Sequence, residues 1–168
     1  MPVANHDTAD GGAIVLIVES GSAHETKAWG RRLASVLEGG ELLGLIGELG
    51  AGKTCFVKGL ARGLHLDEQE ILSPTFTMIQ EHPGRLPLFH IDLYRLDSAG
   101  VDDLGLREYL FSEGVAAVEW FERLNEASEL EHLEVRITYA SASVRRIEFK
   151  AADDRHREVL ARLRARFA

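Results

Sequence analysis

The amino-acid sequence predicts a single α/β domain with a mixed central sheet flanked by helices. Three observations indicate this class. Short apolar runs of strand length alternate along the chain with segments of helical periodicity. One apolar run, residues 42–46, leads directly into a glycine-rich loop and then a helical pattern. Residues 133–139 and 144–149 alternate apolar and polar side chains, as an antiparallel pair of strands does.

The first predicted elements are a strand over residues 13–19 and the helix that follows it. Ser22-Ala23-His24-Glu25 matches a capping box, in which the serine and glutamate side chains bond free N–H groups at a helix start. Gly39-Gly40 is the expected end of this helix. Its apolar face is expected to carry Trp29, Leu33, Val36 and Leu37.

The elements after residue 80 follow from the same reasoning. Residues 86–91 predict a strand that ends at Asp92, and residues 115–118 predict a short buried strand. Between them, residues 98–110 predict a helix with three apolar side chains turned inward. Residues 153–167 predict a closing amphipathic helix, so that helices flank the sheet to the end of the chain.

The bulk composition is that of one soluble globular domain. The chain has 168 residues, of which 45% are hydrophobic and 27% charged, and this length is enough for a substantial core. Residues 1–12 are polar, so we expect a flexible N-terminus followed by one domain over residues 13–168. No repeat, low-complexity tract or linker divides the chain.

Charge and cysteine content limit the cellular compartments and the binding partners to be expected for this chain. The net charge of −8 argues against a broad DNA, RNA or membrane footprint, although a local basic patch could exist within it. No run reaches the roughly 18–20 apolar residues that span a membrane. Cys55 is the single cysteine, so no internal disulfide can form, and we expect a cytoplasmic protein. The scattered histidines predict no zinc site.

The most informative segment is residues 47–54, which match the phosphate-binding P-loop pattern G-x-x-x-x-G-K-[ST]. Its glycines allow main-chain N–H groups to approach phosphates, and the helix that follows directs its N-terminal dipole at the anion. Lys53 supplies a positive charge for the β- and γ-phosphates, and Thr54 supplies a hydroxyl for Mg²⁺. The predicted nucleotide-binding residues are Gly47, Glu48, Leu49, Gly50, Ala51, Gly52, Lys53 and Thr54.

The simpler interpretation of this segment is a glycine-rich turn with a surface lysine. Two features argue against it. The chain has only four lysines beside fifteen arginines, so a lysine at this position is hard to attribute to background. The strand–loop–helix order that a P-loop requires is also present, and it predicts the P-loop NTPase fold.

Acidic residues follow two apolar strands and are the candidate Mg²⁺ and hydrolysis residues. Asp92 ends the strand Leu88-Phe89-His90-Ile91, and Glu119 ends the strand at 115–118. Because the carboxyl ends of the strands line the ligand crevice of open α/β sheets, both acids are expected near the phosphates. The alternatives are a structural cap or salt bridge for Asp92, for example with Arg95. Trp120 is expected to serve packing or to touch the nucleotide or a partner.

A third candidate segment is Ser73-Pro74-Thr75, about twenty residues beyond the P-loop. Proline stiffens the segment, and Thr75 offers a hydroxyl. A threonine in such a loop could sense the γ-phosphate and Mg²⁺, as the switch loops of GTPases do.

Several of these segments together resemble one family. The P-loop, Ser73-Pro74-Thr75-Phe76-Thr77, the residues from His90 to Leu96, Asp103 to Leu110, and Val118-Glu119-Trp120 resemble TsaE, formerly YjeE. The resemblance runs from about residue 15 to residue 150, in the same order and at similar spacing. Many families share the P-loop, but the combination of these segments is far more specific.

The resemblance implies a P-loop ATPase that binds ATP or ADP with Mg²⁺ in the biosynthesis of threonylcarbamoyladenosine (t6A). Its hydrolysis would be weak alone and stimulated by the TsaB–TsaD pair. TsaD transfers the threonylcarbamoyl group to adenosine 37 of tRNA, and a TsaE-type ATPase would reset that complex between turnovers. Contact with tRNA would then be indirect, with no role for DNA or a membrane.

Carried over by position, the resemblance gives each candidate residue a role. Lys53 and Thr54 would hold phosphate and Mg²⁺, Asp92 and Glu119 would be the acidic metal or hydrolysis residues, and Thr75 would be the switch threonine. The predicted catalytic set is therefore Lys53, Glu119, Asp92 and Thr75, and the predicted metal set is Thr54, Asp92 and Glu119.

The chain also departs from the family pattern. Many members have proline after the Glu-Trp pair, where this chain has Phe121, so the path of this loop is open. Arg145-Arg146 lies where members often carry arginine near the nucleotide, and a solvent-facing edge-strand charge is the competing interpretation. The tail after residue 150 gives no functional indication.

Two other functions fit parts of the sequence. A P-loop kinase for a small metabolite is the first, but no arginine-rich lid cluster occurs between residues 110 and 140. A GTPase-like switch is the second, because Asp102-Asp103-Leu104-Gly105 matches D-x-x-G. That match falls within a predicted helix, and no Asn-Lys-x-Asp guanine signature occurs in the chain.

Overall fold

The computed structural model describes residues 12–74, 77–96 and 105–168. The prediction for residues 1–12 therefore concerns a segment that lies outside the described residues, apart from Gly12, and the switch prediction for Thr75 lies outside them too. The elements, in chain order, are β1 (Ile14–Ser20), α1 (Ala23–Ala34), β2 (Leu42–Ile46), α2 (Lys53–Gly63), β3 (Ile79–His82), β4 (Leu88–Asp92), α4 (Arg107–Leu110), β5 (Val115–Glu119), the 3₁₀ helices η1 (Phe121–Arg123) and η2 (Ala127–Glu129), β6 (Leu133–Tyr139), β7 (Arg145–Ala151) and α5 (Asp154–Phe167).

The described strands form one mixed sheet in the order β1-β7-β6-β2-β5-β4-β3. Strands β6, β2, β5 and β4 run parallel in its centre, while β7, β1 and β3 are antiparallel to their neighbours. The predicted α/β class with a mixed sheet is confirmed. Because the central strands are parallel, their carboxyl ends meet at one edge of the sheet.

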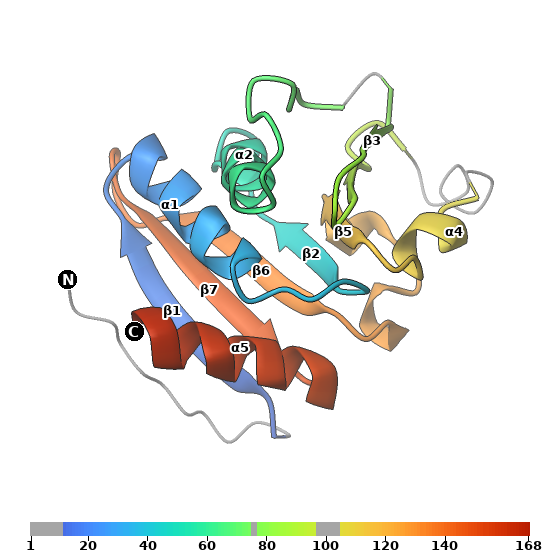
Figure 1. Ribbon diagram of the computed structural model, residues 1–168. Coiled ribbons are helices and arrows are strands. Elements are labelled where there is room, and N and C mark those ends of the chain that lie inside the picture. Colours follow the sequence, from blue (N-terminus) through green and yellow to red (C-terminus); the bar gives the residue numbers. More distant parts are fainter. Residues whose placement is uncertain (1–11, 75–76, 97–104) are drawn as a thin grey trace.

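Helices α1, α2 and α5 cover one face of the sheet, as Figure 1 shows. The main core lies between them and the inward side chains of β1, β7, β6, β2 and β5. Its largest fully buried side chains include Phe56 of α2 and Phe149 of β7, whose ring centroids are 6.0 Å apart. This packing fixes α2 against the sheet, so the loop before α2 is held in place from both sides.

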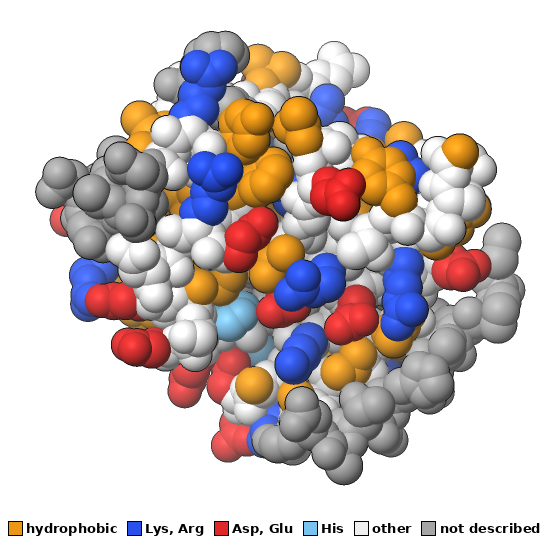
Figure 2. Space-filling model, turned by 180° about the vertical axis from the view of Figure 1, so that it is seen from behind, with side chains coloured by type: hydrophobic (Ala, Val, Ile, Leu, Met, Phe, Trp, Pro, Cys, Tyr) orange, Lys and Arg blue, Asp and Glu red, His pale blue; other side chains and the backbone are white. Residues whose placement is uncertain are grey.

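Among the described residues, those that pack on the other face cover only part of it. A second core lies over β2, β5 and β4, where α4 and η1 pack. Over β1, β7 and β6 the face carries cross-strand pairs of opposite charge, namely Glu19 with Arg146, Arg136 with Glu148, and Glu134 with Lys150. Such pairs stabilise a solvated sheet face. Figure 2, which views the molecule from behind, shows acidic and basic side chains interspersed.

Two predicted helix bounds are corrected. Helix α1 ends at Ala34, five residues before Gly39. Beyond it, the N–H groups of Val36 and Leu37 bond carbonyls three residues back instead of four. Val36 and Leu37 are buried but lie beyond the helix. Of the helix predicted over residues 98–110, residues 98–104 lie outside the described part. Gly105 has a φ of 62°, a left-handed conformation that starts a turn, so α4 begins only at Arg107.

None of the helices in the described part of the chain combines the length and apolarity needed to cross a membrane.

Candidate functional site

The loop between β2 and α2 has the form of an anion-binding turn. Gly50 and Gly52 have φ values of 77° and 117°, which only glycine adopts freely. Gly52 is the N-cap of α2, and no side chain caps this helix start. The first N–H groups of a helix lack intrahelical acceptors, so they face the loop ready for an anion.

Lys53 lies at the centre of this loop. Its ammonium donates hydrogen bonds to the carbonyl oxygens of Gly47, at 2.5 Å, and Glu48, at 3.0 Å. It lies 4.0 Å from the centroid of the Trp120 ring. Burial lowers the pKa of Lys53, and the carboxylates of Glu119, Glu122 and Asp92 oppose this shift. The charge is thus held by loop carbonyls, which a phosphate group could replace as acceptors.

The two candidate acids stand side by side at the carboxyl edge of the sheet. Asp92 of β4 and Glu119 of β5 are direct partners in the parallel register, and both are buried. Oε1 of Glu119 accepts a hydrogen bond from the Thr54 hydroxyl at 2.7 Å. Asp92 accepts from the backbone N–H of Tyr94 at 2.8 Å and from the Ser73 hydroxyl at 3.3 Å. The structure therefore brings Lys53, Thr54, Asp92 and Glu119 together.

His90 is a further member of this site that the sequence analysis did not identify. Its Nε2 lies 2.7 Å from Oε1 of Glu119, and its side chain is fully buried. Its Nδ1 has no partner among the described residues. The signal was present in the sequence, because alternation along β4 places His90 on the same face as Asp92.

The site opens into a hollow of about 240 Å³ between the P-loop and the two strand ends. Trp120 forms one wall, in a left-handed conformation with φ 58°. Its ring is 5.0 Å from that of Tyr94, and the Arg123 guanidinium lies 5.4 Å from the centroid of each. Arg123 also donates to the Tyr94 carbonyl at 2.6 Å. Trp120 is thus both a packing residue and a partly exposed wall of the hollow.

The arginine pair at the start of β7 divides between two places. Arg145 donates from Nε to the Ala51 carbonyl of the P-loop at 3.2 Å and lies 4.0 Å from the centroid of the Tyr139 ring. Arg146 points to the open sheet face, where it pairs with Glu148 at 3.7 Å. Arg145 thus lies against the P-loop and Arg146 faces solvent. The edge-strand interpretation is wrong, because β7 lies between β1 and β6.

Phe121, at the position of the family proline, is buried under the sheet. Its ring lies over Gly44 of β2, where an added Cβ would meet it at 2.5 Å. It also packs against His132, with ring centroids 4.5 Å apart. Packing therefore accommodates phenylalanine at this position, and Glu119 still lies beside Asp92.

The donor set fits Mg²⁺ with a bound nucleotide. Thr54, Asp92 and Glu119 offer only oxygen atoms, which Mg²⁺ prefers. Within the described residues, no three His, Cys, Asp or Glu side chains come together to hold a metal ion by themselves. This arrangement suits Mg²⁺, which is usually held by one or two protein oxygens, substrate phosphates and water.

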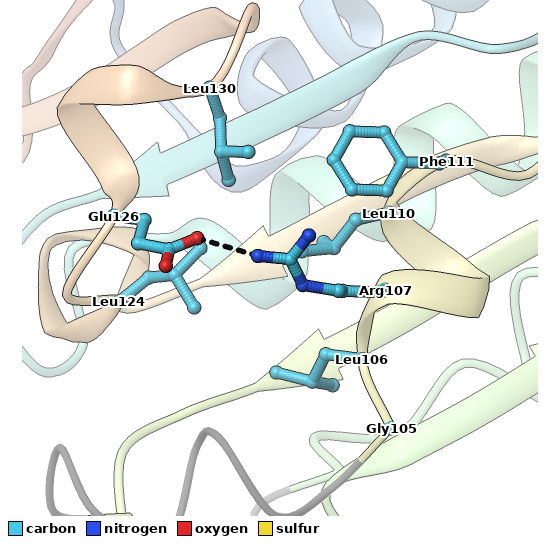
Figure 3. Close-up of a pocket in the computed structure, with 8 residues that line it drawn as sticks. All are labelled: Gly105, Leu106, Arg107, Leu110, Phe111, Leu124, Glu126 and Leu130. Carbon is cyan, nitrogen blue, oxygen red and sulfur yellow. Dashed lines mark hydrogen bonds and ion pairs between the residues drawn. The ribbon is translucent and has the colours of Figure 1, made fainter.

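A second hollow, of about 150 Å³, lies between α4 and the segment around η2. Figure 3 shows Arg107 and Glu126 directed toward one another across it, 3.1 Å apart. Apart from this pair its walls are mostly apolar, and Phe111, one of the lining residues, is 64% exposed. None of the predicted site residues lines this hollow, so it is separate from the P-loop site.

The chain is similar to proteins of one family. The profile of the family "Threonylcarbamoyl adenosine biosynthesis protein TsaE" matches residues 20–147. The tRNA threonylcarbamoyladenosine biosynthesis protein TsaE of Treponema pallidum is 48% identical over 120 residues, which cover 71% of this chain and 87% of the relative. The protein of the same name from Bacillus subtilis is 43% identical over 133 residues, covering 79% and 83%.

Among solved structures, the crystal structure of Bacillus subtilis YdiB is similar over 93% of this chain and 98% of its own. Its TM-score is 0.78, and 35% of the aligned residues are identical.

Proposed function

This chain belongs to the TsaE family of threonylcarbamoyl adenosine biosynthesis proteins and has a P-loop fold, and from this premise we propose that it is an ATPase of tRNA t6A modification. It binds ATP or ADP with Mg²⁺ and hydrolyses ATP. It acts on the TsaB–TsaD pair, which modifies adenosine 37, so that this complex can begin another turnover.

One observation carries the proposal of hydrolysis. Thr54, in the first turn of α2, donates its hydroxyl to Glu119, at the end of β5, at 2.7 Å. This bond joins the phosphate-binding loop to an acid buried beside Asp92. A simple phosphate-binding site needs the loop alone, whereas phosphoryl transfer also needs an anchor for Mg²⁺ and a group that positions water.

Each residue then has a distinct task. The N–H groups at the start of α2 and the Lys53 ammonium bind the β- and γ-phosphates. Thr54 and Asp92 hold Mg²⁺, which when bound neutralises charge on the phosphates. Glu119 orients the attacking water and accepts its proton, and His90 holds Glu119 in place. Arg145 and Tyr139 support the loop from outside through the carbonyls of Ala51 and Leu49.

The partner assignment is supported by the family. In this site a single buried acid, Glu119, would position the attacking water. We therefore expect hydrolysis to be weak until a partner protein binds and fixes the side chains that line the hollow. Leu49, which is 69% exposed, lines that hollow together with the partly exposed Trp120 and Tyr94, and these side chains are open to a partner. Modification of tRNA itself belongs to TsaD in this account.

The experiment is the ATPase rate with and without a purified TsaB–TsaD complex from the same source. The matched variants are Lys53→Ala and Lys58→Ala, two lysines of the same helix, of which only Lys53 lines the hollow. We expect strong stimulation of the wild type and of Lys58→Ala, and none of Lys53→Ala. Tight ATP binding without any stimulation would contradict the proposed function and direct the search toward transfer to a small-metabolite acceptor.

A further inference from the structure

Arginines gather in one hollow far from the P-loop. This hollow, of about 810 Å³, lies where the C-terminal ends of α1, α2 and α5 meet the segment between β3 and β4. Helix α2 runs from Lys53 to Gly63, so the two ends of that helix are about 16 Å apart. The arginines of the hollow, termed here the basic hollow, are Arg31, Arg32, Arg62, Arg85 and Arg166.

The charge of the basic hollow contrasts with that of the chain. The chain has a net charge of −8, yet no aspartate or glutamate lines this hollow. Among the described residues, none of its five arginines forms an ion pair with a carboxylate, whereas arginines elsewhere do so at Glu134 and Glu148. The positive charge here is therefore available to a ligand.

Helix ends alone do not account for this cluster. Arginine at a helix C-terminus interacts favourably with the helix dipole, and this effect accounts for the arginines in the last turns of α1, α2 and α5. Arg85 lies in the connection between β3 and β4 and reaches the same hollow without belonging to a helix. Four separate segments thus contribute like charges to one place, where they repel one another unless an anion is present.

Aromatic contacts hold two of the guanidinium groups in place. Arg32 lies 4.5 Å from the Trp29 ring centroid and 5.7 Å from that of Phe167. Arg166 lies 5.5 Å from the Phe167 ring. Arg31, Arg62 and Arg85 are exposed. A partly ordered set of guanidinium groups spread over several segments suits a chain of phosphates better than one small anion, because each group can bond a different phosphate.

We propose that the basic hollow binds the phosphate backbone of RNA. The choice of RNA over another polyanion rests on the proposed function, since the t6A reaction acts on tRNA. Contacts of this kind carry no sequence information, so they position the RNA without reading it. Because the basic hollow and the P-loop lie at opposite ends of α2, both can be occupied at once.

The test is direct binding of fluorescently labelled, unmodified tRNA to the full chain, measured by anisotropy across salt concentrations. The variant carries Arg31→Gln, Arg62→Gln and Arg85→Gln. The matched control carries Arg136→Gln, Arg146→Gln and Lys150→Gln, on the open sheet face. Both lower the net charge by three, so a difference between them cannot come from charge alone.

Five phosphate contacts predict a slope of log K against log salt of roughly −4.5, and the two remaining in the variant predict roughly −2. At 0.1 M salt, one decade below 1 M, this difference in slope corresponds to a loss of roughly 300-fold in affinity. The control triple should keep the wild-type slope and affinity. Retained binding of a fluorescent ADP analogue shows that each variant is folded. The single variant Arg85→Gln should change the slope of log K against log salt by about one unit.

Two results would overturn the proposal. One is that tRNA does not bind the wild-type protein at 50 mM salt, or binds the two triple variants equally well. The other is loss of TsaB–TsaD stimulation in the arginine triple while tRNA binding is unchanged, because the basic hollow would then dock an acidic protein. If tRNA binding fails in this way, normal stimulation of ATP hydrolysis by TsaB–TsaD would leave the proposed function intact. If tRNA binds as expected but TsaB–TsaD does not stimulate ATP hydrolysis, the proposed function alone would be refuted.

Discussion

Replacing His90 with leucine should slow ATP hydrolysis without weakening nucleotide binding. The His90 Nε2 lies 2.7 Å from a carboxylate oxygen of Glu119, and both side chains are at most 4% exposed. A hydrogen bond to a charged group contributes about 1.5–3 kcal/mol. If this bond holds Glu119 in its reactive position, its loss lowers kcat by roughly 10- to 100-fold. His90 does not line the hollow, so the KM for ATP should stay within about twofold.

The assay is partner-stimulated hydrolysis with kcat and KM measured separately, together with the affinity for a fluorescent ADP analogue. His90→Gln places an amide N–H near the position of Nε2 and should restore part of kcat. His82→Leu, on the neighbouring strand β3, is the matched control and should leave kcat unchanged. Wild-type kcat in His90→Leu, or a glutamine variant no better than leucine, would refute the positioning of Glu119 by His90.

Three further predictions concern stability and reactivity. Asp153→Ala should lower the free energy of unfolding in urea by about 1 kcal/mol, because Asp153 caps α5 through the N–H of His156. Burial raises the pKa of Asp153, but the hydrogen bonds from His156 outweigh burial and hold this pKa below its usual value, so the cost should vanish as pH falls through the lowered pKa. A cost that persists in acid would contradict the assignment. Partial burial raises the pKa of the Cys55 thiol above its usual value, so alkylation by iodoacetamide should still be accelerating at pH 9, and ATP should slow it because Cys55 lines the hollow. A plateau by pH 8 would be inconsistent with this raised pKa. Gly44→Ala should lower the thermal midpoint by several degrees because its Cβ would meet the Phe121 ring, and an unchanged midpoint would show that this ring moves aside freely.

The elements of the fold followed from local patterns. Apolar alternation along residues 133–139 and 144–149 predicted β6 and β7, because the two faces of these strands differ in burial. The capping box at Ser22 predicted the start of α1, and the Ser22 side chain accepts from the N–H of Glu25. The P-loop was evident because all of its parts lie within eight consecutive residues.

The features that escaped the sequence depend on residues brought together across the chain. His90 and Glu119 are 29 positions apart, and Arg145 reaches a P-loop carbonyl 94 positions away. The end of α1 at Ala34 was also missed, since Val36 and Leu37 continue the apolar pattern and are buried without being helical. The spacing of apolar residues indicates which side chains are buried. It indicates a helix only where the buried residues also lie within one.

The basic hollow was likewise hidden from composition. A net charge of −8 argues against an RNA partner when the chain is treated as a whole. The five arginines are spread over 136 sequence positions, from Arg31 to Arg166, and only the meeting of three helix ends with the β3–β4 connection gathers them. Charge averaged along a chain therefore says little about a surface built from distant segments.

The most direct test of the account is the number of t6A groups formed on tRNA per TsaB–TsaD complex, with ATP and with wild-type protein or Glu119→Gln. The account predicts many turnovers with the wild type and about one with the variant, which should still bind nucleotide and the complex. Multiple turnovers with Glu119→Gln at the wild-type rate would contradict it, because modification would then proceed without hydrolysis at this site.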